Sequence, residues 1–155
     1  MKPWVHGRSE IDLFIEQRLL GRVSPDRTLA DLMLSESDRH LASSRTLTDS
    51  DSTGSFALAY DASRKALAAI LENQGLRATS RGGHRVVEDS SRAQLVPPQG
   101  PEVNGFGWMR KLRNSTEYPS ATTPTAGPDD AAHAQGFAED VISMARSLLD
   151  QMPPY

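Results

Sequence analysis

Apolar residues recur three and four positions apart along most of the chain, which is the spacing of a helix that buries one face. Apolar and polar residues alternate nowhere for more than a few positions, so signals for strands are almost missing. The pattern therefore predicts an all-α fold, a bundle of five or six helices. The expected helices span about residues 9–20, 25–47, 55–74, 84–95, 106–117 and 129–148.

Residues that favour helix ends accompany the first two of these segments. Ser9 is a candidate cap for the first helix, and Gly21 is expected to end it. Ser24 followed by Pro25 predicts the start of the second helix, because proline suits the first helical position after a capping serine. Residues 36–40 in the middle of that helix are all polar, so a kink or a break is expected there.

The remaining boundaries depend on glycine and proline. Gly75 is expected to end the long, alanine-rich third helix in a left-handed conformation. Residues 97–105 are rich in proline and glycine and are expected to be irregular. Residues 119–128 are expected to form a loop before the last helix, and residues 152–155 a frayed tail.

Length and composition narrow the class of protein. The chain has 155 residues, which suits one helical domain over residues 1–155 with a short N-terminal helix in residues 1–23. The net charge of −3 argues against a protein that coats nucleic acid through a global positive field. The absence of cysteine excludes disulfides, zinc–thiolate sites and a cysteine nucleophile. No apolar run is long enough for a membrane span and no signal peptide is evident, so we expect a cytoplasmic protein.

Arg113 is the most informative position for chemistry. On a helical projection of residues 106–117 it falls on the same side as the apolar Phe106. A guanidinium on that side is costly unless it is paired or reaches water. Two interpretations are open: an ion pair with Glu117 one turn later, or an arginine that lines a cleft and binds phosphate beside the polar Asn114.

The pattern Arg113-Asn114-x-x-x-Tyr118 at the end of this helix resembles the Arg-x(4–6)-His motif of HEPN domains, which often reads Arg-Asn-x-x-x-His. The alanine-rich helix of residues 56–71 and the loop that follows it resemble the core helix and loop of the same family. That loop contains Gly75-Leu76-Arg77 and Gly82-Gly83-His84. The likeness covers roughly residues 28–150.

The resemblance implies an up-and-down helical bundle that forms a homodimer, with Arg113, Asn114 and Tyr118 at the two-fold cleft. Active members of the family are metal-independent endoribonucleases, and many are toxins paired with an antitoxin protein. The family histidine is replaced here by Tyr118, and a phenol that titrates near pH 10 is a poor base at neutral pH. The resemblance therefore leaves two functions open: RNA cleavage, or a degenerate dimer that binds RNA, nucleotide or a partner protein without cutting. A third possibility is a purely structural helical protein.

Basic residues near these segments are candidates for binding RNA. They are Arg110 and Lys111 on the helix before the motif, and Arg81, His84 and Arg85 in and after the glycine-containing loop. His84 has a structural alternative as a residue that satisfies backbone groups of the loop. No spacing of histidines and acids suits a metal, so neither a metal nor a cofactor is expected.

Overall fold

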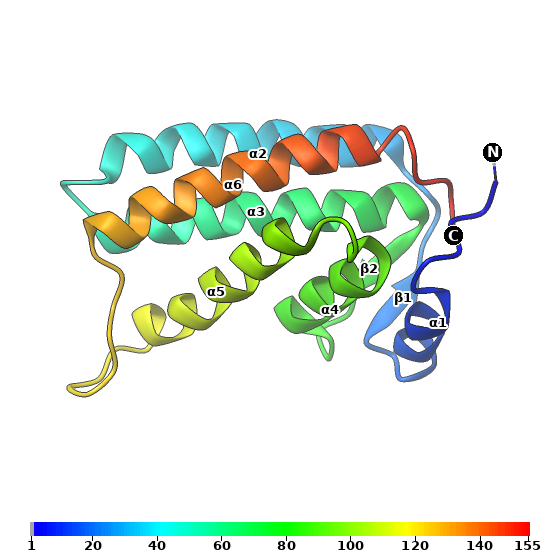
Figure 1. The fold of residues 1–155 in the computed structure, drawn as a ribbon, viewed down its shortest axis with the longest axis horizontal. Coiled ribbons are helices and arrows are strands. Elements are labelled where there is room, and N and C mark those ends of the chain that lie inside the picture. Colours follow the sequence, from blue (N-terminus) through cyan, green and yellow to red (C-terminus); the bar gives the residue numbers. More distant parts are fainter. Residues whose placement is uncertain (1) are drawn as a thin grey trace.

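The computed structural model describes residues 2–155 and confirms the all-α prediction, with six helices and two short strands in that range. In chain order the elements are α1 (Arg8–Glu16), β1 (Leu20–Arg22), α2 (Arg27–Leu47), α3 (Ser52–Gln74), β2 (Leu76–Ala78), α4 (Gly83–Leu95), α5 (Gly100–Glu117) and α6 (Pro128–Leu148). Helices α2, α3 and α6 run alongside one another (Figure 1). Helices α5 and α4 cover the other side of α3, and α1 and the strands lie at one end.

Helix α3 is the centre of the bundle because it packs against α2, α6, α5, α4 and β2. Its alanines Ala59, Ala62, Ala66 and Ala69 are fully buried, and such small side chains let neighbouring helices approach closely. The helix begins after Asp51, whose carboxylate accepts a hydrogen bond from the Gly54 backbone, and ends as predicted at Gly75, with φ of 82°.

Helix α2 begins later than predicted and has no break. Its N-cap is Asp26, whose carboxylate accepts from the Leu29 backbone N–H at 2.8 Å, so Ser24 and Pro25 lie outside the helix. The polar stretch 36–40 stays helical because its side chains have partners across the bundle. Glu36 forms an ion pair with Lys65 on α3.

The first helix is shorter than predicted, and a strand follows it. Helix α1 begins after Gly7, which has φ of 72° and whose position would place a Cβ 2.3 Å from the Ala93 carbonyl oxygen, so only glycine fits there. Ser9 lies inside the helix and caps nothing. Gly21, the predicted end, lies in β1 and pairs with Arg77 of β2 in an antiparallel ladder. The strand forms because it pairs with residues remote in the sequence, and no local sequence pattern predicts such pairing.

Helix α5 starts at Gly100, so the expectation of irregular structure over residues 97–105 is wrong for residues 100–105. Val103 is completely buried, and Gly105 lies where a Cβ would be 2.3 Å from the Phe137 ring of α6. The close crossing with α6 holds a glycine-rich segment helical that has little helical propensity of its own.

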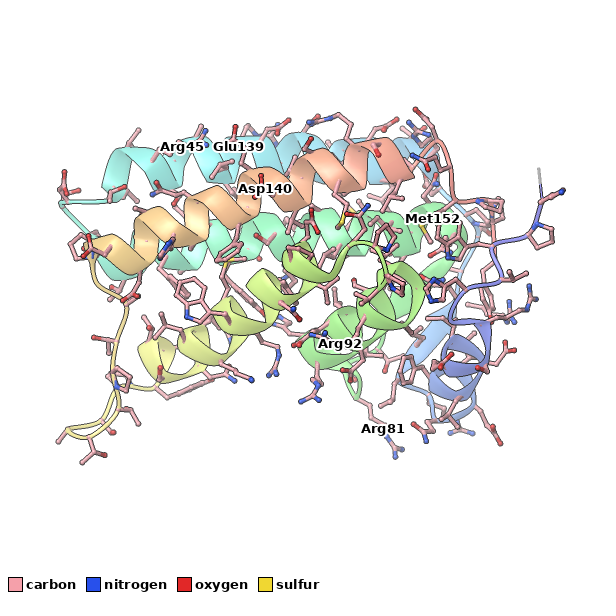
Figure 2. All side chains as sticks on the ribbon, in the orientation of Figure 1. Arg45, Arg81, Arg92, Glu139, Asp140 and Met152 are labelled. Atoms are coloured by element: carbon pink, nitrogen blue, oxygen red, sulfur yellow. The ribbon has the colours of Figure 1, made fainter. Side chains whose placement is uncertain are left out.

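The predicted loop separates α5 from α6, but the expectation of a frayed tail is wrong. Asp130 accepts a hydrogen bond from the Gly127 backbone at the start of α6. Met152 is 2% exposed, and Figure 2 shows it turned into the molecule beyond the end of α6. The Tyr155 hydroxyl donates to Asp12 at 2.6 Å, which fastens the end of the chain to α1. Within the described residues, no helix combines the length and apolar character needed to cross a membrane.

Candidate functional site

Arg113 lies on the exposed side of the contact between α5 and α3, where both interpretations of the sequence are partly realised. Its Nη2 is 2.6 Å from the Glu117 Oε2, and its side chain is 27% exposed. Its guanidinium carbon lies 5.7 Å from the centre of the Tyr60 ring, a cation–π distance. Arg113 also lines a cavity of about 310 Å³ between α5 and the start of α3. It therefore belongs to the edge of the core and faces water.

Tyr60 connects Arg113 to a second predicted residue. The Tyr60 ring is buried and stacks on Phe106, with centroids 5.4 Å apart and an interplanar angle of 11°. Its hydroxyl lies 2.8 Å from Nδ1 of His84 on α4. Burial raises the pKa of Tyr60 to about 12, so the hydroxyl keeps its proton at neutral pH. Arg113 and His84 thus contact one tyrosine from two different helices.

His84 is a half-buried imidazole between cationic neighbours. Burial lowers its pKa below 6.5, and the charges of Arg64 and Arg113 lower it further. The ring is therefore neutral at pH 7, and the Tyr60 hydroxyl fixes its orientation through Nδ1. No described residue forms a hydrogen bond with Nε2.

Arg64 completes the group and was not among the predicted site residues. It lies one turn after Tyr60 on α3, and its Nη2 is 2.6 Å from the Asp61 Oδ1. Burial raises the pKa of Asp61, but the hydrogen bond and charge of Arg64 and the charge of Lys65 outweigh this effect, so the pKa lies below its usual range. The i, i+4 spacing of Tyr60 and Arg64 was visible in the sequence, but nothing there indicated that it faces His84.

Arg110, which the sequence suggested as an RNA-binding residue, forms an ion pair inside the protein. Its Nε is 2.6 Å from the Glu88 Oε2, and the two side chains are 15% and 9% exposed. Burial raises the pKa of Glu88, but Arg110 and Arg92 outweigh it and hold the pKa below its usual range. Gly107 lies against the same carboxylate, where a Cβ would be 2.7 Å from Oε1. The pair fastens α5 to α4.

The other predicted residues do not join this group. Arg81 is exposed at the tip of the loop before α4 and points away from the helices (Figure 2). Arg85 pairs with Asp89 of its own helix at 3.1 Å, and Lys111 is exposed. Asn114 is exposed one position after Arg113. Tyr118 caps α5 and is 73% exposed, and no hydrogen bond between described residues joins its hydroxyl to Arg113.

Comparison of the chain with protein-family models, with curated proteins and with solved structures finds no match. The chemistry of the site thus has to be argued from its geometry. We call Arg64, His84 and Arg113, together with Tyr60, the tyrosine-centred cluster. No set of three or more acidic or histidine side chains in residues 2–155 has the arrangement of a metal site.

The tyrosine-centred cluster is suited to an anion with several oxygens. Two guanidinium groups present planar arrays of N–H donors, and a neutral imidazole adds a nitrogen whose orientation is fixed. The carboxylates of Asp61 and Glu117 already pair with the two guanidinium groups, so an incoming anion shares or replaces these partners. Such a site selects for a strongly charged, multidentate ligand over a weak one.

Proposed function

We propose that this protein is a HEPN-like RNA-binding protein and that the tyrosine-centred cluster holds one phosphate of the RNA. The observation that supports this most is that His84 on α4 and Arg113 on α5 both contact Tyr60 of α3, while the charge of Arg64, one turn after Tyr60, lowers the pKa of His84. A phosphate is the anion that matches two guanidinium forks and an imidazole. The Arg-Asn-x-x-x-Tyr pattern adds the family resemblance, with Arg113 as the shared residue.

RNA cleavage is the second candidate, and the lowered pKa of His84 favours it. In the tautomer whose Nδ1 donates to the Tyr60 hydroxyl, Nε2 has a lone pair that can accept the proton of a ribose 2′-hydroxyl. The 2′-oxygen then attacks the adjacent phosphorus, the 5′-oxygen leaves with a proton from water, and a 2′,3′-cyclic phosphate forms. Arg113 stabilises the charge on the phosphate. His84 would then supply the imidazole that Tyr118 lacks, and a toxin role with an antitoxin partner follows from the resemblance.

Binding is tested by the affinity for a fluorescein-labelled single-stranded RNA, measured by fluorescence anisotropy at several salt concentrations. Arg113→Gln is expected to weaken binding by about tenfold or more, because a charge-assisted contact is lost. It should also reduce the salt dependence by about one phosphate contact. The matched control is Arg146→Gln, which breaks an ion pair of the same 2.6 Å length with Asp38 on the α2–α6 side. Equal affinities for both variants and the parent would contradict the proposal.

Cleavage is tested with the same RNA on a denaturing gel. His84→Gln should abolish cleavage by the parent protein, while His133→Gln, an exposed histidine of α6, should leave it unchanged. RNA that is bound but not cut by the parent establishes the binding function alone. Cutting that persists in His84→Gln would show that His84 is not the base.

We also propose that two copies form a homodimer with α5 near the two-fold axis, as in the family that the motif resembles. Exposed Asn114 and Tyr118 would then lie beside the same groups of the second copy. Light scattering at tens of micromolar should give twice the monomer mass of 16.9 kDa. A mass of one chain would contradict the dimer and leave the phosphate site as a property of the single chain.

A further inference from the structure

Arginines without an acidic partner gather around α1 and the two strands. Most lysines and arginines of residues 2–155 form an ion pair with an aspartate or glutamate. Those that do not are Lys2, Arg8, Arg18, Arg22, Arg81 and Lys111. Arg8, Arg18, Arg22 and Arg81 are exposed and belong to α1, the turn after it, β1 and the loop before α4. We call these four residues the arginine surface.

The fold brings the segments of Arg18 and Arg81 together, although they are remote in the sequence. The Thr79 hydroxyl donates to the Arg18 carbonyl oxygen at 2.7 Å and accepts from the Gly82 backbone N–H at 3.2 Å. A Cβ at Gly82 would lie 2.2 Å from the Leu19 carbonyl oxygen, so the loop packs directly on the turn. Arg18 has φ of 60°, a conformation that a non-glycine residue keeps only where its surroundings enforce it. The backbone that carries both arginines is therefore fixed.

Arg8 and Arg22 are held by the last residue of the chain. Their guanidinium carbons lie 5.0 Å and 5.2 Å from the centre of the Tyr155 ring, which is a cation–π distance. A guanidinium that stacks on an aromatic ring keeps the N–H donors at its edge free for an anion. The two side chains are thus ordered without being neutralised.

The acids of α1 lower the net charge of this end of the molecule but do not pair with its arginines. Glu10 accepts a hydrogen bond from Ser9 at 2.9 Å, and Asp12 accepts one from the Tyr155 hydroxyl at 2.6 Å. Glu16 is exposed and forms no ion pair with a described residue. The arginine surface therefore favours an anion that contacts the guanidinium groups directly over one that is held by a long-range field.

The arginine surface continues into the tyrosine-centred cluster through the loop before α4. Thr79 and Ser80 of this loop line a cavity of about 340 Å³ that Arg64 and His84 of the cluster also line. Arg81 follows Ser80 directly and precedes His84 by three positions, so their Cα atoms are at most about 11 Å apart. One strand of RNA can therefore contact both.

We propose that the arginine surface binds further phosphates of the RNA strand whose first phosphate lies at the tyrosine-centred cluster. The inference rests on the proposed function and extends the site from one phosphate to a strand. A strand with a phosphate on every nucleotide matches arginines from four separate segments, whereas a very short RNA reaches the cluster alone. Contacts to phosphate carry no information about the bases, so this surface adds affinity without sequence preference.

The experiment compares two fluorescein-labelled oligouridylates, a trinucleotide and a dodecanucleotide, by fluorescence anisotropy at several salt concentrations. The parent protein should bind the dodecanucleotide about tenfold or more tightly than the trinucleotide. The double variant Arg18→Gln with Arg81→Gln should weaken binding of the dodecanucleotide by about tenfold or more and lower its salt dependence by about two phosphate contacts. Its affinity for the trinucleotide should stay unchanged.

Two further double variants separate direct contact from net charge and from damage to the fold. Arg45→Gln with Arg146→Gln removes the same charge from the α2–α6 side and is the matched control. Figure 2 shows Arg45 beside α6 and Arg81 on the opposite side of the molecule. Arg18→Lys with Arg81→Lys keeps both charges and should retain the salt dependence of the parent.

The outcomes separate this inference from the function on which it rests. If Arg113→Gln weakens both RNAs but the Arg18 and Arg81 double variant behaves like its control, the arginine surface is overturned and the phosphate site stands. If Arg113→Gln changes neither RNA while the dodecanucleotide still depends on Arg18 and Arg81, the phosphate site fails and RNA binds at the arginine surface alone. Capture by phosphatidylserine vesicles without binding of the dodecanucleotide would assign the surface to a membrane and overturn the inference.

Discussion

The Tyr60 hydroxyl and the His84 Nδ1 are 2.8 Å apart, although the two residues belong to different helices and only the fold brings them together. The contact links the buried centre of the bundle, where the Tyr60 ring stacks on Phe106, to a surface that also carries Arg113. The tyrosine is thus both a core residue and the support of the proposed phosphate site. Changes at this contact separate the two roles.

Tyr60→Phe removes the hydroxyl and keeps the stacked ring. We expect the free energy of unfolding to fall by about 1 kcal/mol, the net value of a typical hydrogen bond. RNA affinity should fall by more than this loss of stability explains, because the His84 ring is no longer held by Nδ1. Urea unfolding and anisotropy titrations on the same protein measure both. An unchanged RNA affinity would show that His84 needs no support from Tyr60.

The pKa of His84 makes stability depend on pH. Its folded-state pKa lies below 6.5, mainly because of burial, so between that pKa and 6.5 the unfolded chain binds more protons than the folded one. Stability from this group is fully present above about pH 6.5 and decreases as the pH falls through this window.

This dependence can be measured by NMR titration of the histidine side chains and by urea unfolding at several pH values. The His84 resonance should titrate with a midpoint below 6.5, and His84→Gln should flatten the loss of stability between neutral and mildly acidic pH. His133→Gln serves as the control. A His84 midpoint above 6.5 would contradict the environment described here.

Arg110 and Arg113 lie one turn apart on α5, but the same substitution should destabilise the protein far more at Arg110 than at Arg113. Arg110→Gln leaves the 9% exposed Glu88 carboxylate without its closest partner, and we expect stability to fall by about 3 kcal/mol. Arg113→Gln leaves Glu117, which is 46% exposed, in contact with water, so the loss should stay below about 1 kcal/mol.

Thermal and urea unfolding of the two variants measure the difference, and RNA affinity should show the reverse order once the fraction of folded protein is matched. A large loss of stability in Arg113→Gln would favour the interpretation that its pair with Glu117 is structural only.

Gly7 tests the packing that orients the N-terminal segment, and Gly136 of α6 provides a comparison at an open position. Gly7→Ala places a methyl group 2.3 Å from the Ala93 carbonyl oxygen at a φ of 72°, and we expect a loss of about 3 kcal/mol. Gly136→Ala, where nothing lies within 4 Å of the new methyl group in the middle of α6, should raise stability by about 0.5–1 kcal/mol. Calorimetric unfolding of both variants measures whether stability falls for Gly7→Ala and rises for Gly136→Ala. A tolerated Gly7→Ala would mean that α1 is free to move away from α4.

The parts of the fold that follow from local chemistry were predictable from the sequence. The alanine-rich face of α3 and the stop at Gly75 depend on residues close together in the chain. The early start of α5 and the anchored tail depend on tertiary partners: Val103 and Met152 are buried by helices that no local pattern identifies. The two strands form through pairing between Gly21 and Arg77, which are remote in the sequence.

The residues of the candidate site also fall into those that the sequence predicts and those that only the fold identifies. Arg113 stood out because a cation fell on an apolar face, and His84 because it followed two glycines before a helix. Their common neighbour Tyr60 looked like an ordinary core aromatic at helical spacing. Arg110 and Arg113 are both candidates for binding RNA in the sequence, and the position of Glu88 on the adjacent helix makes Arg110 the structural one of the two, whereas Arg113 faces water.

The central claim is the location of the phosphate, and NMR of the arginine and histidine side chains during an RNA titration tests it most directly. We expect the guanidinium Nε–H resonances of Arg64 and Arg113 and the ring resonances of His84 to shift together, saturating at one affinity. The resonances of Arg146 should stay in place. Shifts confined to Arg81 and Arg85, or saturation without any change at Arg113, would place the RNA elsewhere and contradict the phosphate site.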